Sequence, residues 1–118
     1  MGHTLVKVKL YGSDPLKFED VEFLVDTEST YSWIPKSILE KLNIRPKGLW
    51  KFRTVDGRIL ERQIGEAVME YMDEKATRMV VFAEDGDATV LGVDALEGLR
   101  LEVDPITRQL KKVEALLA

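Results

Sequence analysis

The sequence has no cysteine and a single histidine, His3, among its 118 residues. Without cysteine the chain cannot form disulfide bonds, cysteine-ligated zinc or iron–sulfur sites, or a thiol nucleophile. We expect His3 to be an exposed residue near the chain terminus, so histidine-based metal clusters and Ser-His triads are excluded as well. Any catalysis must therefore rest on carboxylates, hydroxyls, lysines or the backbone, and the sequence predicts no metal site and no cofactor.

Long apolar segments are also missing. The longest uninterrupted apolar run, Met79 to Ala83, is far shorter than the roughly 20 residues that a membrane-spanning helix needs. Near the N-terminus, Lys7 and Lys9 interrupt the only early apolar segment, which is unlike a secretory signal. We therefore expect no membrane partner and a cytoplasmic location.

The chain has the length of one compact domain, and we expect residues 1–118 to form a single domain. It carries 17 basic and 21 acidic residues, and the resulting net charge of −4 argues against nucleic acid as the main partner. The basic residues are concentrated in the middle of the chain, which is the pattern of an ordinary solvated face. They are Lys41, Arg45, Lys47, Lys51, Arg53, Arg58 and Arg62.

Alternating apolar residues predict two strands in the first part of the chain. Leu5 to Leu10 alternates apolar residues with lysines, which is typical of a half-buried strand. A second strand runs into Asp26, and from Phe23 to Val25 both of its faces are apolar. An acid at the end of such a strand lies in a sheltered place, where its surroundings can shift its pKa.

The rest of the chain predicts more short strands and two short helices. The dipeptide Asp56-Gly57 indicates a tight type I′ hairpin turn between strand-like runs. The acidic segment 84–87 lacks the spacing of an EF-hand loop, so a solvated turn is a better interpretation than a calcium site. This pattern favours an all-β fold, either a small barrel or a closed sandwich. The expected elements are a hairpin over 50–64, strands at 67–71, 77–83, 89–91, 101–103 and 106–113, a helix opened by Pro35, and a helix at 94–99 with Gly98 near its C-cap.

The segment from Phe23 to Ser29 resembles the signature of aspartic proteases. In that signature three apolar residues precede Asp, then Thr or Ser, then Gly, then Ala or Ser; here they precede Asp26-Thr27-Glu28-Ser29. The order of the later elements is also similar to the family, with Asp56-Gly57 where the flap would be and Val90-Leu91-Gly92 leading into a helix. Because the chain has one such Asp motif, the likeness is to the retropepsin-like, retroviral type of aspartic protease.

This resemblance implies a small closed retropepsin-like β-barrel that acts as a homodimer. In the family, two carboxylates share a proton and activate the water that attacks a peptide bond, so one Asp26 per chain is half of a site. The implied activity is an aspartic endopeptidase acting on polypeptides, with the Asp56-Gly57 hairpin as a mobile flap and Tyr31 and Trp33 either near the pockets or in the core. The implied catalytic residues are Asp26 and Thr27, the latter gripping the partner's loop, and the implied substrate-binding residues are Glu28, Ser29, Asp56, Gly57, Val90 and Leu91.

Glu28 departs from the family, which has glycine at this position. Glycine lets the backbone approach the substrate and the partner closely, and a glutamate side chain would occupy that space. In a dimer, two Glu28 side chains could add two carboxylates to the Asp26 pair. Glu28 would therefore weaken the peptidase, and the alternative is a catalytically impaired dimer that binds peptides or a cation. If a peptide binds, we expect Arg53, Arg58 and Arg62 to favour acidic peptides over nucleic acid.

Overall fold

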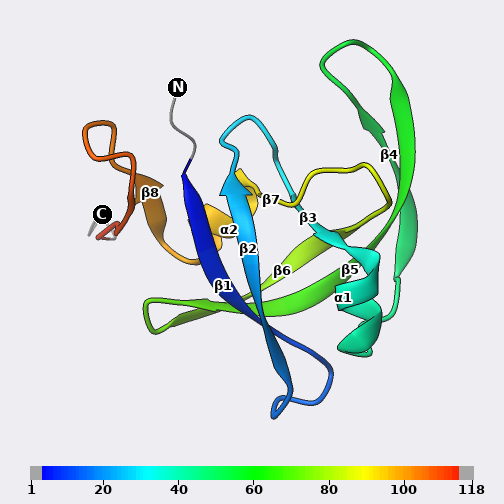
Figure 1. The fold of residues 1–118 in the computed structure, drawn as a ribbon, viewed down its shortest axis with the longest axis horizontal. Helices are drawn as coiled ribbons and strands as arrows, with labels where there is room; N and C mark the ends of the chain where they lie inside the picture. The colour runs from blue at the N-terminus through cyan, green and yellow to red at the C-terminus, as the bar shows by residue number, and fades with distance from the viewer. Residues whose placement is uncertain (1–3, 115–118) are drawn as a thin grey trace.

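The computed structural model describes residues 4–114, so His3 lies outside the described residues. The described part is mostly β-strand with two short helices, which confirms the predicted preponderance of strands (Figure 1). In chain order the elements are β1 (Leu5–Tyr11), β2 (Phe18–Val25), β3 (Ser32–Pro35), α1 (Lys36–Lys41), β4 (Gly48–Arg53), β5 (Ile59–Tyr71), β6 (Glu74–Ala83), β7 (Val90–Leu91), α2 (Val93–Gly98), β8 (Leu101–Val103) and β9 (Leu110–Lys112).

Seven of these strands form one sheet that returns to its starting strand. The order of neighbours is β1-β2-β7-β3-β6-β5-β4, and β1 also pairs with β5. Strands β1, β2, β7, β3, β6 and β5 therefore make a continuous ring of pairings. The last strand, β4, pairs only with β5 and forms the free edge of the sheet. Strands β8 and β9 form a separate two-stranded sheet.

The apolar core follows from the alternation of side chains along these strands. In β1 every second side chain is buried, as the sequence predicts, and Val8 pairs with Val21 of β2. Helix α1 packs near β3 and β6 and buries Leu39, while α2 packs against β6 and β8. The side chains with no exposed surface are Val8, Leu10, Phe23, Ile34, Leu39, Met69, Val80, Leu91 and Leu99.

The hairpin between β4 and β5 has the predicted position but a different turn. A type I′ turn needs a positive φ at both central residues, whereas only Gly57, with φ of 87°, is positive here. The Gly57 N–H donates to the Thr54 carbonyl at 3.0 Å, and the Thr54 N–H donates to the Arg58 carbonyl at 2.8 Å. This is a three-residue loop in which a type I turn is followed by a left-handed glycine, so the type I′ prediction at Asp56-Gly57 is wrong.

A turn with two positive φ values occurs instead between β5 and β6. Met72 and Asp73 have φ of 51° and 66°, and Tyr71 pairs with Glu74 on either side of them. Two residues in this conformation match the right-handed twist of the flanking strands. Residues with a side chain rarely adopt it, and Met72 is the less suited of the two.

Two other details differ from the sequence-based expectations, and a third agrees. Strand β3 was not predicted, because its four residues follow the Asp26 loop without a clear alternating pattern. Gly98 is the last residue of α2, next to the C-cap Leu99, as expected, and the left-handed position after the helix is taken by Arg100, with φ of 58°. The Asp104-Pro105 turn extends further than expected, so that β9 begins only at Leu110.

Neither helix found within residues 4–114 is long and apolar enough to cross a membrane.

We predict that Met72→Asn stabilises the protein by about 1 kcal/mol, because asparagine tolerates the left-handed conformation better than methionine does. Half of the Met72 side chain is exposed, so little packing is lost. Urea denaturation of both proteins measures the difference. The control is Val55→Asn, the same kind of exposed replacement at a turn residue without positive φ, which should leave the free energy of unfolding unchanged.

Candidate active site

Asp26 lies directly after β2, in a loop whose shape its own side chain supports. Its Oδ1 accepts a hydrogen bond from the Glu28 N–H at 2.9 Å, and its carbonyl accepts one from the Ser29 N–H at 3.2 Å. Aspartate favours such turns because its short side chain reaches the backbone two residues on. Within residues 4–114 no protein group donates a hydrogen bond to Oδ2. One carboxylate oxygen therefore holds the loop and the other stays available.

The segment from β7 to the start of α2 holds this loop in place by backbone hydrogen bonds. The Asp26 N–H donates to the Leu91 carbonyl at 3.0 Å, and the Val93 N–H donates to the Ser29 carbonyl at 2.8 Å. Between them, Gly92 approaches the loop so closely that a Cβ atom there would lie 2.5 Å from the Tyr31 carbonyl oxygen and 2.7 Å from that of Ser29. Only glycine fits this position.

A buried hydroxyl fixes the same region. Ser32 is the one buried polar side chain among the described residues, with 1% of its surface exposed. Its Oγ accepts a hydrogen bond from the Gly92 N–H at 3.0 Å, which satisfies a donor that the close approach would otherwise leave unpaired. Ser32 thus joins β3 to β7 where they support the Asp26 loop.

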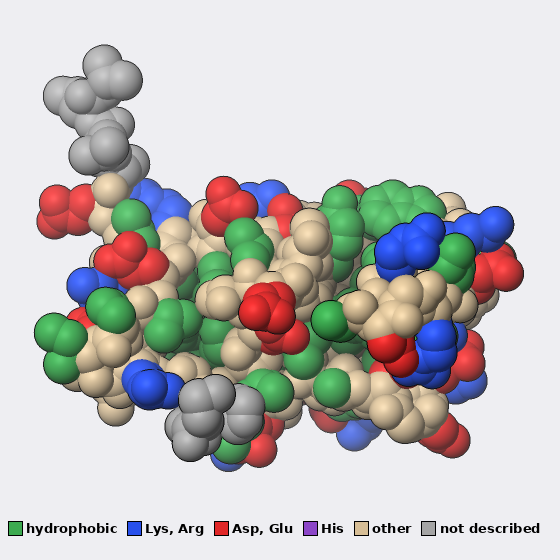
Figure 2. Space-filling model, turned by 90° about the horizontal axis from the view of Figure 1, so that it is seen from above, with side chains coloured by type: hydrophobic (Ala, Val, Ile, Leu, Met, Phe, Trp, Pro, Cys, Tyr) green, Lys and Arg blue, Asp and Glu red, His purple; other side chains and the backbone are tan. Residues whose placement is uncertain are grey.

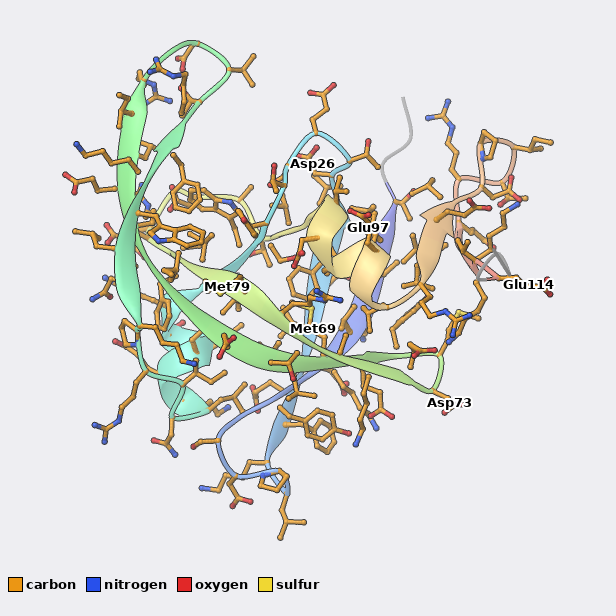
Figure 3. The ribbon with its side chains drawn as sticks, turned by 180° about the vertical axis from the view of Figure 1, so that it is seen from behind. Asp26, Met69, Asp73, Met79, Glu97 and Glu114 are labelled. Atoms are coloured by element: carbon orange, nitrogen blue, oxygen red, sulfur yellow. The ribbon has the colours of Figure 1, made fainter. Side chains whose placement is uncertain are left out.

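An open groove of about 620 Å³ separates the Asp26 loop from the β4–β5 hairpin. Both segments point to the same edge of the molecule (Figure 1), and Asp26 lies at this edge in the view from behind (Figure 3). Figure 2 looks down on this edge, with acidic side chains near its middle and basic ones toward the hairpin end. The groove is lined by Asp26, Glu28, Ser29, Thr30, Tyr31 and Trp33 from the loop and β3, by Lys51, Phe52, Arg53, Thr54, Val55 and Leu60 from the hairpin, and by Gly86, Asp87, Ala88 and Val90.

The structure brings only some of the sequence-predicted site residues to this groove. Asp26, Glu28, Ser29 and Val90 line it. Leu91 is fully buried beneath the loop and acts through its carbonyl.

The remaining candidates lie elsewhere. Thr27 lines a smaller cavity of about 260 Å³, together with Thr4 and residues of the 103–108 loop. Asp56 and Gly57 are exposed at the hairpin tip and do not line the groove; their neighbours Thr54 and Val55 do.

Aromatic side chains connect the two walls of the groove. The rings of Trp33 and Phe52 lie 5.1 Å apart, and those of Tyr31 and Trp50 lie 5.6 Å apart, both in edge-to-face arrangements. Strands β3 and β4 are not neighbours in the sheet, so these contacts hold the hairpin strand over β3. Tyr31 and Trp33 are half-buried and line the groove, and neither belongs to the apolar core of the described residues. Of the two positions left open for them by the sequence, the structure gives the one outside the core.

No protein-family model matches the chain, and neither does any curated protein. The retropepsin resemblance therefore stays a prediction from the sequence.

Glu28 is exposed on the groove beside Asp26. Its φ is not among the positive values in the chain, so the backbone here does not require glycine. What the side chain adds is volume and negative charge next to Asp26. Within residues 4–114 no three acidic or histidine side chains form a group that could hold a metal ion.

Asp87 forms a shielded ion pair with Arg62 that the sequence did not suggest. Two hydrogen bonds of 2.7 and 3.1 Å join the guanidinium to the carboxylate, and the side chains are only 15% and 13% exposed. Asp87 also accepts a hydrogen bond from the Glu84 N–H at 2.8 Å. The pair thus connects the hairpin strand β5 to the 84–87 loop at one end of the groove. The hydrogen bonds from Arg62 are the main cause that lowers the pKa of Asp87 below its ordinary value.

We predict that Asp87→Asn lowers the free energy of unfolding by about 1.5–3 kcal/mol at pH 7, because it removes a charge-assisted interaction. The folded-state pKa of Asp87 is depressed, so the stabilisation is complete above the ordinary value of 3.8 and is lost as the pH falls through the lower folded value. Urea titrations at pH 7, 5 and 3 measure the free energy of unfolding of both proteins. The difference between the two free energies should be smaller at pH 3 than at pH 7 and 5. A difference that disappears already at pH 5 would contradict this assignment.

Proposed function

We propose that the chain is a retropepsin-type aspartic endopeptidase that forms a closed β-barrel and acts as a symmetric homodimer. The observation that carries the proposal is the position of Asp26, whose carboxylate lies on the wall of a groove with Oδ2 available and a β-hairpin opposite. An extended peptide fits between these walls because β4 is a free sheet edge with unpaired backbone groups.

The chemistry needs a second carboxylate, and a second copy of the chain supplies it. One Asp26 accepts a proton from a water molecule, and the water oxygen bonds to the peptide carbonyl carbon. The other Asp26 gives its proton to the carbonyl oxygen, so that a tetrahedral diol forms. The first Asp26 then passes the proton it took from water to the amide nitrogen, the other takes back a hydroxyl proton, and the C–N bond breaks to leave a carboxylic acid and an amine. Two carboxylates this close share one proton at the start, since like charges a few ångströms apart cannot both ionise freely.

Thr27 supports the placement of the partner. It is exposed, and it lines the small cavity near Thr4 and Asp104 while Asp26 lines the groove. Leu5 and Ile106 near that cavity expose 60% and 89% of their surface. A partner that covers this face would bury apolar side chains and place the two Asp26 loops together.

The test is a peptidase assay with a denatured polypeptide at mildly acidic pH, with and without a transition-state inhibitor directed at paired carboxylates. We expect cleavage that the inhibitor blocks and that Asp26→Asn abolishes. The matched control is Asp20→Asn, an exposed aspartate of β2 away from the groove, which should keep full activity. Cleavage that survives Asp26→Asn would contradict the proposal.

An active site shared between two subunits leads to a second expectation, which uses the same proteins. After subunits exchange in an equimolar mixture of wild type and Asp26→Asn, about a quarter of the dimers carry two aspartates, so activity should fall to about a quarter of that of wild type at equal total concentration. Sedimentation should show a dimer at micromolar concentration that Thr27→Ala weakens and that Thr77→Ala, on the exposed side of β6, does not. A monomer that remains fully active would exclude the shared site.

Glu28 favours a second candidate, a dimer of the same fold that binds peptides with little or no cleavage. Its carboxylate lines the groove next to Asp26, where the family keeps only backbone. The endopeptidase and the peptide-binding dimer predict different effects on activity when the Glu28 side chain is removed.

We predict that Glu28→Gly raises kcat/KM on the order of tenfold, equivalent to about 1.4 kcal/mol of transition-state stabilisation, by removing charge and volume beside the reacting carboxylates. Glu28→Gln keeps the volume and removes the charge, so it separates the two causes. Adding Asp26→Asn should abolish whatever is gained. An inactive wild type rescued by Glu28→Gly identifies the impaired binder, and equal activities with identical pH profiles in all three proteins would show that Glu28 has no effect on the site.

A further inference from the structure

Two basic side chains on the hairpin wall of the groove have no partner within the described part of the chain. Lys51 and Arg53 both line the groove and are exposed. Neither forms an ion pair or a side-chain hydrogen bond with any of residues 4–114. They are two positions apart in β4, so their side chains leave the same face of the strand, roughly 7 Å from one another along it. This is the outer face, because Trp50 and Phe52, which alternate with them, pack toward Tyr31 and Trp33. The residue paired with Lys51 on β5 is Glu61.

Most other basic residues of the same stretch are already neutralised. Arg58 pairs with Asp56 at the hairpin tip at 3.1 Å, and Arg62 pairs with Asp87. Two of the three arginines expected to attract acidic peptides are therefore engaged within the chain. Arg45 has no ion-pair partner among the described residues, but it lines a different cavity, together with Gly12 and Glu66. The unpaired positive charge of β4 is thus concentrated at Lys51 and Arg53, along the edge strand that borders the groove.

The opposite wall of the groove carries the carboxylates of Asp26 and Glu28. A ligand with negative charge along its whole length, such as a nucleic acid strand, would be repelled there. An extended peptide paired with β4 presents alternate side chains to the two faces of that strand, so it can place an acid beside Lys51 or Arg53 on the outer face and an apolar side chain beside Phe52 on the inner face. Apolar surface between the walls comes from Trp33, Phe52 and Val90.

We propose that Lys51 and Arg53 form a subsite that selects peptides with an acidic side chain next to an apolar one. The inference rests on the proposed function, because it assigns the groove to a peptide. A strand paired with the free edge of β4 brings one of its side chains opposite Lys51 or Arg53, at the cross-strand distance where opposite charges attract. The expected preference for glutamate over glutamine at that position is on the order of threefold to tenfold.

The experiment measures binding and cleavage of the same probes. The probes are fluorescein-labelled octapeptides with a central Phe-Leu pair, in which glutamate or glutamine is placed in turn at each other position. Anisotropy at pH 7, where glutamate is ionised, gives affinities for the Asp26→Asn protein, and cleavage by wild type gives kcat/KM. We expect one position at which glutamate is preferred in both measurements, by an amount that decreases as salt is added.

Variants then assign the preference to residues. Lys51→Gln combined with Arg53→Gln should abolish it, and Lys51→Glu combined with Arg53→Glu should reverse it toward a lysine-containing probe. Arg45→Gln is the matched control. It removes a positive charge from the same basic stretch of the sequence, but Arg45 does not line the groove, so the glutamate preference should remain. Sedimentation of each variant verifies that the exposed edge has not begun to associate.

The outcomes separate this inference from the proposed function. Binding selectivity without cleavage by wild type would keep the subsite and remove the peptidase. Cleavage with no glutamate preference, or a preference that Arg45→Gln removes equally, would overturn the subsite and leave the peptidase standing. Tighter binding of a labelled single-stranded oligonucleotide than of any acidic octapeptide would assign the basic wall to nucleic acid and overturn the inference.

Discussion

The close approach of Gly92 to the Asp26 loop is the constraint on which the candidate site depends. The backbone of residues 89–94 lies against the loop, and the carbonyl oxygens of Ser29 and Tyr31 occupy the space where any other residue would place its Cβ. The Ser32 hydroxyl and the Leu91 carbonyl complete the hydrogen bonds of this contact. Because β7 is parallel to β2 and antiparallel to β3, the same contact also joins the ring of strands on both sides of the loop.

The two walls of the groove are held in different ways. The Asp26 wall is fixed by backbone hydrogen bonds to buried elements. The hairpin wall is a free edge strand, positioned by the ring contacts of Trp33 with Phe52 and of Tyr31 with Trp50, and by the ion pair between Arg62 and Asp87. A segment held by a few side-chain contacts opens at lower cost than one held by a continuous hydrogen-bonded network. The hairpin is therefore the wall expected to move.

Several elements could be predicted because local sequence determines them. The alternation in β1, the strand that ends at Asp26 and the helix after Pro35 follow from side-chain spacing and backbone preference. The turn types were harder to predict from the sequence than the strands and helices. Asp56-Gly57 adopts a three-residue loop because Thr54, Asp56 and Arg58 bond with one another across the turn, whereas Met72 and Asp73 accept unfavourable φ values because the long pairing of β5 with β6 leaves two residues to reverse the chain.

The sequence by itself determined the strand content, the position of Asp26 at the end of a strand and the replacement of glycine by Glu28, since each depends only on neighbouring residues. Only the tertiary structure decided which side chains share the groove. It separates Thr27 and Leu91 from it, brings Lys51 and Phe52 into it, and pairs Arg62 with Asp87, 25 positions away. These relations depend on how distant strands pair, and the pairing is set by burial summed over the whole core rather than by any local pattern.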